Sequence, residues 1–170
     1  DLARITSQLG DGLDALVRLF MDAEPVARAG LDELLPRGVS DTLETLRLVR
    51  PDPRGMHRLV PTVLLYPTES LYVISDLPLD PVNPHAPYEM PTDVVYPAVT
   101  HGVRTFLEAI PTDPCDAFLE LCSGTGIAAL RAARSARHVW AVDIAARSTT
   151  FAAFNALLNG IENATTLTGD

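Results

Sequence analysis

The sequence predicts an α/β protein whose C-terminal part is built on a parallel, doubly wound β-sheet. Two observations lead to this prediction. Residues 117–143 contain, in order, an apolar strand, a glycine loop, an alanine-rich helix and a second apolar strand. Residues 147–168 then add another helix and another strand. Strands that alternate with helices in this way are typical of a parallel sheet with helical crossover connections.

The glycine loop lies between the first predicted strand and the first predicted helix. The strand, 117–121, is a short apolar run, as a buried parallel strand should be. The loop Cys122-Ser-Gly-Thr-Gly126 contains two glycines, which allow the backbone to turn sharply and to approach a ligand closely. The helix over 127–135 is rich in alanine and leucine. Asp143 follows the second strand, 138–142, at a position where nucleotide-binding folds hold a ribose.

The glycine spacing alone fits two kinds of cofactor. Gly124-x-Gly126-x-x-Ala129 with Asp143 also matches the dinucleotide fingerprint, which allows alanine at its third position. Glu120 discriminates between the two, because a carboxylate at the end of the strand would repel the pyrophosphate of a dinucleotide. S-adenosylmethionine has no phosphate, and its sulfonium and ammonium groups favour an acidic rim. An NAD-dependent oxidoreductase is the alternative.

The segment Glu120-Leu-Cys-Ser-Gly-Thr-Gly126 resembles the first motif of class I S-adenosylmethionine-dependent methyltransferases, whose usual form is acid-x-Gly-x-Gly-x-Gly. Cys122 replaces the first glycine of that motif. The resemblance implies a Rossmann-like sheet with its first three strands present, Glu120 at the methionine end of the cofactor and Asp143 on the ribose hydroxyls. The cofactor-binding residues that it implies are Glu120, Cys122, Ser123, Gly124, Thr125, Gly126, Asp143, Ile144 and Asp170.

The second helix and strand carry a further resemblance. The helix over 147–158 has Phe151, Phe154, Leu157 and Leu158 as its expected buried stripe, and a strand is predicted over 164–168. The run Asn155-Ala-Leu-Leu-Asn-Gly160, followed by that strand and Gly-Asp, is similar to the branch of the family that methylates RNA base amines or the glutamine amide of release factors. By this resemblance Asp170 would accept a hydrogen bond from the adenine amino group.

The motif that holds the substrate amine in that branch, of the Asn/Asp-Pro-Pro-Tyr type, does not occur in the sequence. Asp80-Pro81 and Asn83-Pro84 precede the glycine loop and are in the wrong place. We therefore expect the catalytic residues to lie beyond residue 170, the chain to be a fragment of a longer enzyme, and the fragment alone to show no turnover. We expect the methyl acceptor to be a nucleic-acid base amine, as in RNA, and a protein glutamine is an alternative, so the expected partner is RNA or a protein substrate. A small-molecule acceptor and a non-catalytic nucleic-acid-binding module are alternatives.

Residues 1–76 are predicted to form a small separate α+β domain. Three short helices are expected, and the third begins at Ser40-Asp41, where Asp41 and Glu44 have the spacing of an acidic capping box. Residues 58–65 and 71–74 then predict a β-hairpin around a turn at 66–70. Three helices followed by a hairpin resemble a winged helix.

Arginines gather in the expected third helix and wing of this domain. Besides His57 they are Arg47, Arg50, Arg54 and Arg58, and Asp52 is the only acid among them. Such a cluster is a candidate surface for phosphate contacts with nucleic acid. The alternative is a solvated surface, where arginines also favour the C-terminal end of a helix.

A proline-rich linker over 77–98 is predicted to connect the two parts. Six prolines exclude a helix there. Tyr88 and Tyr96 would either cover the cofactor as lid residues or pin the linker to the surface. The methyltransferase part is expected to be 99–170. It opens with a helix over 99–110 that begins at Thr100 and His101, and Val99, Val103, Phe106, Leu107 and Ile110 share one helical face.

Composition bounds the remaining possibilities. The chain has 170 residues, of which 47% are hydrophobic, and this suits one or two compact domains. No apolar run reaches the length of a membrane span. A formal net charge of −9 excludes a protein coated in nucleic-acid-binding charge. Cys115 and Cys122 show no disulfide or metal spacing, so a reducing, cytoplasmic setting and no metal are expected. All 13 basic residues are arginine, which suggests a GC-rich bacterial genome.

Overall fold

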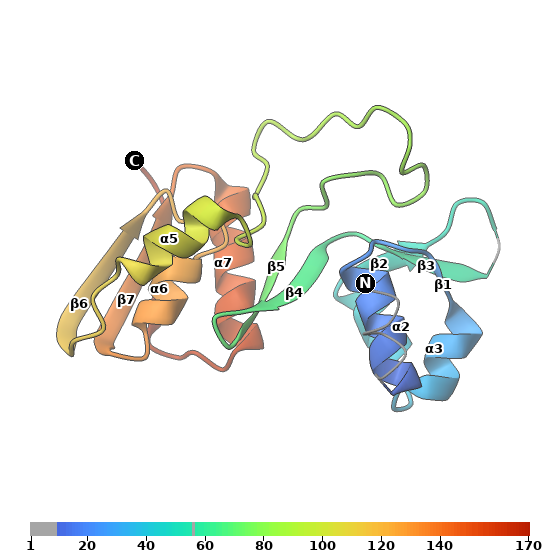
Figure 1. The fold of residues 1–170 in the computed structure, drawn as a ribbon, viewed down its shortest axis with the longest axis horizontal. Coiled ribbons are helices and arrows are strands. Elements are labelled where there is room, and N and C mark those ends of the chain that lie inside the picture. The colour runs from blue at the N-terminus through green and yellow to red at the C-terminus, as the bar shows by residue number, and fades with distance from the viewer. Residues whose placement is uncertain (1–9, 56) are drawn as a thin grey trace. The chain divides into compact units, whose positions relative to one another are not determined.

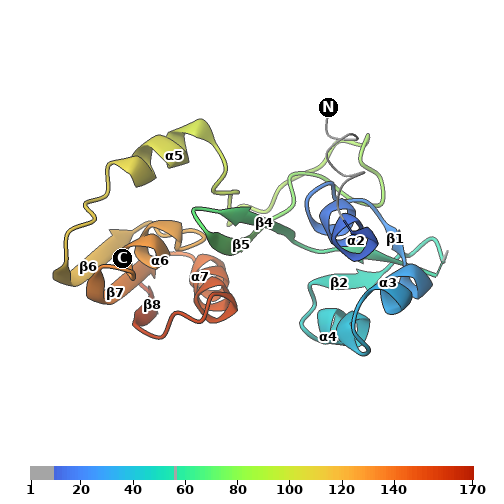
Figure 2. The same cartoon turned by 60° about the horizontal axis from the view of Figure 1, so that its bottom comes forward.

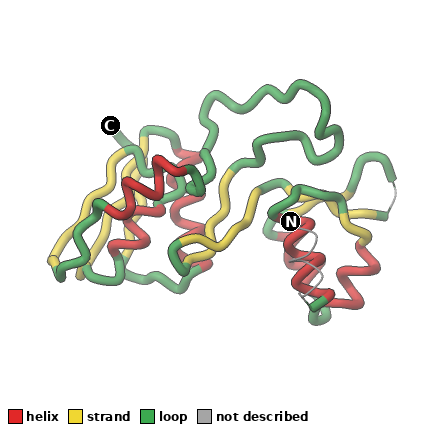
Figure 3. The backbone as a smooth tube through the Cα atoms, in the orientation of Figure 1, coloured by secondary structure: helices red, strands yellow, loops and turns green. Residues whose placement is uncertain are grey.

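The computed structural model describes residues 10–55 and 57–170, and these fold into two compact units (Figure 1). Unit 1 contains residues 10–64 and 77–89, and unit 2 contains 65–76 and 90–170. Residues 1–9 of the expected N-terminal domain lie outside the described residues. The proline-rich segment is thus shared between the units, and 77–98 contains neither helix nor strand, as its prolines predict (Figure 3).

Unit 1 combines short helices with an antiparallel sheet. Its described elements are α2 (Asp11–Phe20), β1 (Val26–Ala27), α3 (Arg28–Leu34), α4 (Val39–Thr45), β2 (Val49–Pro51) and β3 (Arg58–Pro61). The sheet has the order β1-β3-β2 and is antiparallel throughout (Figure 2). Leu19, Leu31, Leu59 and Val60 are almost completely buried and form the core of the unit. Helices and sheet therefore enclose one small apolar core.

The hairpin that follows the third helix differs from the expected one. Strands β2 and β3 form it and are paired antiparallel, and the segment that joins them is called the β2–β3 loop. The hairpin expected over 58–74 is confirmed from residue 64 onward, whereas residues 58–61 form β3, which pairs with β1 and β2 and ends at Pro61. The chain leaves β3 there and forms a separate two-stranded sheet, β4 (Leu64–Thr68) and β5 (Leu71–Ser75), around a turn at Glu69 and Ser70.

The capping box expected at the start of the third helix is also wrong. Gly38, at φ 85°, precedes α4, and no side chain caps the helix. Asp41 and Glu44 instead accept hydrogen bonds from the guanidinium of Arg28 on α3. A charged donor on the neighbouring helix offers these carboxylates a stronger partner than the backbone N–H groups of their own helix do.

Unit 2 contains the predicted parallel sheet. Its strands β6 (Cys115–Leu121), β7 (Ala136–Asp143) and β8 (Ala164–Thr168) lie in the order β6-β7-β8 and are parallel. Helices α6 (Ile127–Ala132) and α7 (Ala146–Leu158) connect them. The alternation of strand and helix confirms the Rossmann-like fold class that the sequence predicts.

Small residues build the core of unit 2 between the sheet and its helices. Ala129 and Ala132 of α6, Val139 and Ala141 of β7, and Ala152 of α7 are buried together. Short side chains allow the helix backbones to come close to the sheet. On the opposite face of the sheet, Leu119 and Leu121 of β6 are 57% and 67% exposed.

The apolar stripe expected on α7 is wrong. Phe151 and Phe154 are only partly buried, and Leu157 is 79% exposed. The buried face is composed of small and polar residues: Ser148, Thr149, Ala152, Asn155 and Ala156. The cause is tertiary, because this face of α7 contacts the sheet, the glycine loop and β5 at once, where bulky side chains have no room.

Helix α5 (His101–Glu108) precedes β6, and Thr100 caps it by accepting from the backbone N–H of Val103, as the predicted start requires. Of its expected apolar face, Leu107 and Ile110 are buried, whereas Phe106 is 55% exposed. Across the portion of the chain that the structure describes, no helix combines the length and apolarity needed to cross a bilayer.

Candidate functional site

A cavity of about 620 Å³ opens at the carboxyl ends of β6 and β7, within unit 2. The glycine loop after β6 forms its floor, and Asp143, at the end of β7, forms one side. Segment 92–98 and Val103 and Phe106 of α5 contribute the remaining walls. The carboxyl ends of parallel strands are where ligands bind in open α/β sheets.

The two glycines of the loop are required for different reasons. A methyl group at Gly126, which has φ 75°, would lie 2.8 Å from Cβ of Ala152 on α7. Gly126 therefore allows the loop to pass directly over that helix. Gly124 has φ 51°, but a methyl group there would meet nothing within 4 Å. Gly124 thus supplies the turn and leaves its side facing open space.

Cys122 occupies the position of the missing motif glycine and adopts the backbone that glycine favours. Its φ is 55°, in the left-handed region that costs a non-glycine residue about 1–2 kcal/mol. Its side chain is exposed and lines the cavity. The loop therefore keeps the geometry of a three-glycine motif, with a thiol at the cavity wall.

Asp143 fastens the loop to the end of β7. One carboxylate oxygen accepts from the backbone N–H of Gly124 at 2.8 Å, and the other accepts from Ala145 N–H at 2.9 Å. Each carboxylate oxygen can accept a second hydrogen bond. Asp143 can thus hold the loop and still accept from hydroxyl groups of a ligand in the cavity.

Glu120 lies beneath the loop with a raised pKa. The side chain lines the cavity, the residue is only 8% exposed, and one oxygen accepts from the backbone N–H of Ala129 at 2.8 Å. Burial, with a smaller contribution from the charge of Asp143, raises the pKa of Glu120 to about 7, against the opposing effect of the hydrogen bonds from the helix backbone. Glu120 therefore exchanges a proton near neutral pH.

The polar groups around the cavity define the ligand that fits. Two carboxylates, Glu120 and Asp143, border it, and the hydroxyl oxygen of Ser123 is buried without a partner among the described residues. Carboxylates attract a cation and accept from hydroxyl groups, and they repel a pyrophosphate. The two carboxylates thus suit a ligand that combines positive charge with a ribose, as S-adenosylmethionine does.

The residues predicted from the sequence are only partly assembled at this cavity. Glu120, Cys122, Ser123, Gly124, Thr125 and Asp143 line it, whereas Gly126, the last residue of the loop, faces Ala152 of α7. Ile144 is 75% exposed, Asp170 is exposed at the end of β8, and neither lines the cavity. Of the two tyrosines considered as lid residues, Tyr96 lines the cavity and Tyr88 belongs to unit 1.

Sequence reasoning missed several residues of the cavity wall. Phe106 lines the cavity, although the sequence places it on the apolar face of its helix, and Ser148 also lines the cavity, although no sequence pattern marks it as a ligand-binding residue. Asp93, close to Tyr96, also lines the cavity. A run of exposed apolar and polar residues in a loop has no periodicity that could have identified the wall.

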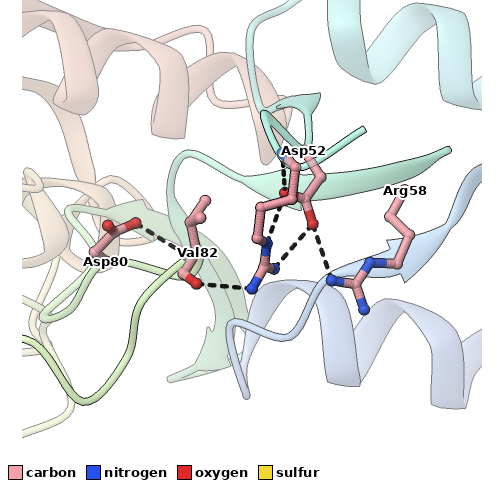
Figure 4. Close-up of polar contacts among 5 residues, drawn as sticks. Asp52, Arg58, Asp80 and Val82 are labelled. Carbon is pink, nitrogen blue, oxygen red and sulfur yellow. Dashed lines mark hydrogen bonds and ion pairs between the residues drawn. The ribbon is translucent and has the colours of Figure 1, made fainter. Parts of the chain in front are cut away.

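The candidate phosphate-contacting arginines fall into two pairs. Figure 4 shows the polar contacts that converge on Asp52, the residue directly after β2, whose side chain is fully buried. It accepts hydrogen bonds from Arg54 and Arg58 at 2.9 Å, and Arg54 also donates to the carbonyl of Val82. The Arg54 guanidinium, assisted by Arg58, holds the pKa of Asp52 well below its usual range.

The other two arginines are differently placed. Arg47, directly after α4, and Arg50, on β2, are exposed, and neither forms an ion pair within residues 10–55 and 57–170. The charges of Arg54 and Arg58 are instead used to close the β2–β3 loop around Asp52. No group of three or more His, Cys, Asp or Glu side chains suited to a metal ion occurs in that same part of the chain.

No model of a known protein family matches the chain, and no curated protein sequence does. Solved structures do match parts of it. A SAM-dependent methyltransferase from Streptococcus mutans, described as putative, is 20% identical over 65% of this chain and 27% of its own, with a TM-score of 0.46. The tRNA m1G37 methyltransferase of M. jannaschii is 16% identical over 64% of this chain and 30% of its own, with a TM-score of 0.42.

A precorrin 8w decarboxylase from Methanobacterium thermoautotrophicum is 24% identical over 45% of this chain and 42% of its own, with a TM-score of 0.40. The chain spans less than half the length of each of these structures. Those described as S-adenosylmethionine-dependent or tRNA methyltransferases are the kind of protein that the glycine-loop motif resembles.

The close approach of the loop to α7 predicts that alanine substitutions at the two glycines lower the free energy of unfolding by different amounts. Gly126→Ala should lower the free energy of unfolding by about 2–4 kcal/mol, because it combines a left-handed backbone with a clash against Ala152. Gly124→Ala should cost about 1–2 kcal/mol, from the backbone alone. Urea denaturation measures both. Adding Ala152→Gly should recover part of the loss in the first variant only, and equal losses at the two positions would contradict the packing argument.

The raised pKa of Glu120 predicts a pH-dependent stability. The folded protein keeps a proton on Glu120 that the unfolded chain releases near pH 4.5, so its contribution to stability falls as pH rises from about 4.5 to about 7. Glu120→Gln retains the acceptor for Ala129 and should be more stable than the wild type by up to about 3 kcal/mol above pH 7, with little difference near pH 4.5. Urea unfolding at several pH values measures this, with exposed Glu108→Gln as control. A difference independent of pH would refute the prediction.

Proposed function

We propose that unit 2 binds S-adenosylmethionine and that the protein is an S-adenosylmethionine-dependent methyltransferase. The observation that carries the proposal is the pair of carboxylates, Glu120 and Asp143, on either side of a glycine loop at the carboxyl end of a parallel sheet. This arrangement offers a site for a cation and a ribose side by side. A dinucleotide would bring its pyrophosphate against the same carboxylates, which disfavours the alternative of an NAD-dependent enzyme.

The residues of the cavity would divide the work of holding this cofactor. Asp143 would accept hydrogen bonds from the ribose hydroxyls, and Glu120, ionised by a neighbouring positive charge, would stabilise the methionine end. Ser123, whose buried hydroxyl has no partner among the described residues, would gain one. Segment 92–98 and α5 would exclude water from the open side. The bound cofactor supplies a methyl group that a nucleophile takes by in-line displacement, so the task of the protein is alignment.

For the acceptor we propose a nucleic-acid base amine, such as one in RNA. Two features support this. The run Asn155 to Asp170 resembles the branch of the family that acts on such amines, and unit 1 has helices, a β2–β3 hairpin and the exposed Arg47 and Arg50 at the place of a wing. A protein glutamine amide is the alternative acceptor. The exposed free thiols of Cys115 and Cys122 support a reducing, cytoplasmic setting.

Calorimetric titration with S-adenosylhomocysteine and, separately, with NAD tests the cofactor. S-adenosylhomocysteine should bind and NAD should not. Asp143→Ala and the milder Asp143→Asn should weaken binding by about tenfold or more, as expected for loss of charged hydrogen bonds. Asp116→Ala, which removes an exposed carboxylate paired with Arg137, is the matched control and should change nothing. Failure of the folded wild type to bind S-adenosylhomocysteine, or a preference for NAD, would overturn the proposal.

The same samples locate the ligand through the two free thiols. Cys122 lines the cavity, whereas Cys115, at the opposite end of β6, does not. Saturating S-adenosylhomocysteine should therefore slow the alkylation of Cys122 by iodoacetamide and leave Cys115 unchanged. Equal protection of both thiols, or of neither, would place the ligand elsewhere.

The proposed nucleic-acid contact is tested on the exposed arginines. Arg47→Ala and Arg50→Ala should each weaken binding of a short RNA hairpin and lower the salt dependence of the binding constant by about one unit of slope. Fluorescence anisotropy at several salt concentrations measures this, and Arg37→Ala, also exposed in unit 1, is the control. Arg54 is a poor choice because it also closes the loop around Asp52. Unchanged affinity in both variants would exclude this surface.

A further inference from the structure

Asn155 of α7 and Asn159, which caps the end of that helix, form hydrogen bonds with strand β5 as a neighbouring strand would. The side-chain oxygen of Asn155 accepts from Ile74 N–H at 2.7 Å, and its amide nitrogen donates to Ile74 C=O at 3.2 Å. Asn159 makes the same pair of bonds with Tyr72, at 2.8 and 2.7 Å. The edge of β5 is thereby paired by side-chain amides, which removes an exposed sheet edge.

The match depends on two periodicities. Residues four apart on a helix are separated by about 6 Å along its axis. Residues two apart on a strand are separated by about 6.6 Å, and their N–H and C=O groups point to the same side. Asn155 and Asn159 therefore meet Ile74 and Tyr72 in register. A side-chain amide, with one acceptor and two donor hydrogens, reproduces the backbone pattern that each strand residue requires.

Asn155 makes one further bond that Asn159 does not. Its amide nitrogen also donates to the carbonyl of Thr125 in the glycine loop, at 3.0 Å. The residue is completely buried, and its oxygen and both amide hydrogens are used. The second donor of Asn159 instead returns to the carbonyl of Asn155 on its own helix. Asn155 thus connects β5 directly to the floor of the cavity.

The hairpin in turn holds the cavity wall. Asp76 follows β5, and its backbone N–H donates to Val95 C=O at 3.0 Å while its carboxylate accepts from Val95 N–H at 2.8 Å. Arg147 of α7 pairs with the same carboxylate. The hydroxyl of Tyr66 on β4 accepts from Ala98 N–H. Segment 92–98 is therefore fixed by bonds from the β4–β5 hairpin near its middle and at its end.

We propose that Asn155 is a positioning residue for the cofactor site: it fixes the β4–β5 hairpin and the glycine loop to one point on α7, and so sets the distance between the wall formed by 92–98 and the floor of the cavity. Asn159 secures the same strand without contact to the loop. The proposal rests on the proposed function for its binding readout, and its structural part concerns this chain alone.

Two variants separate positioning from general stability. Asn155→Ala and Asn159→Ala both remove an amide that pairs with β5, and both should lower the melting temperature. Only Asn155→Ala also frees the glycine loop. It should weaken S-adenosylhomocysteine binding by about tenfold or more, the cost of leaving buried partners without their hydrogen bonds, and Asn159→Ala by less than about threefold. Calorimetry at a temperature where both variants are folded measures the difference. Equal losses in the two variants would overturn the proposal.

A measurement without ligand tests the proposal separately from the proposed function. Amide hydrogen exchange in the wild type should show protection at Val95 and Ala98, and Asn155→Ala should lose it. Tyr66→Phe, which removes only the acceptor for Ala98, serves if Asn155→Ala does not fold; it should expose Ala98 and weaken binding by about threefold or more. Unchanged exchange at Val95 and Ala98 would overturn the proposal even if the cofactor binds. Wild-type protein with protected amides and no affinity for S-adenosylhomocysteine would instead refute the proposed function.

Discussion

The close contact between the glycine loop and α7 is the constraint on which unit 2 depends. At Gly126 there is no room for even a methyl group above Ala152, so loop and helix meet backbone to backbone. This contact explains the small buried residues of α7, because bulky side chains on that face would lift the loop away. It also brings the carbonyl of Thr125 within reach of Asn155, one helical turn farther along α7. The packing of two backbones therefore decides where the polar contacts of the cavity can form.

The electrostatics of the cavity follow from the same geometry. Glu120 is buried under the loop, where desolvation raises its pKa. Each carboxylate oxygen of Asp143 accepts one backbone hydrogen bond, one from the loop and one from the turn after β7. Without a ligand, the charge of Asp143 also disfavours the ionised form of Glu120 and so raises its pKa. A cation in the cavity would offset that repulsion and favour the charged form of Glu120. A site built in this way favours positively charged ligands, in the same direction as the net charge of −9 of the whole chain.

How much the sequence could predict depended on the range of the interactions. The order from β6 to β8 was predictable because hydrophobic runs, glycines and alanine-rich helices are local signals. The buried face of α7 could not be predicted, because Asn155 and Asn159 form hydrogen bonds with residues of β5 that lie 81 and 87 residues away in the sequence. The hairpin around Glu69 and Ser70 was predictable from its turn, but the start of its first strand was misplaced, because residues 58–61 pair with β1 and β2 although they belong to the same apolar run. The cavity wall at 92–98 is an irregular segment whose position is set by distant partners, which no local pattern encodes.

The distribution of arginines limits what unit 1 could contribute under the proposed function. Two of the four candidate arginines, Arg54 and Arg58, neutralise the buried Asp52, which leaves Arg47 and Arg50 exposed without an ion pair within the described residues. Two phosphate contacts correspond to a slope of about −1.8 when the logarithm of the binding constant is plotted against the logarithm of the salt concentration. Proteins whose affinity changes roughly thousandfold with salt make about six to ten such contacts. Under the proposed function, unit 1 would therefore contribute only a weak electrostatic contact to an RNA.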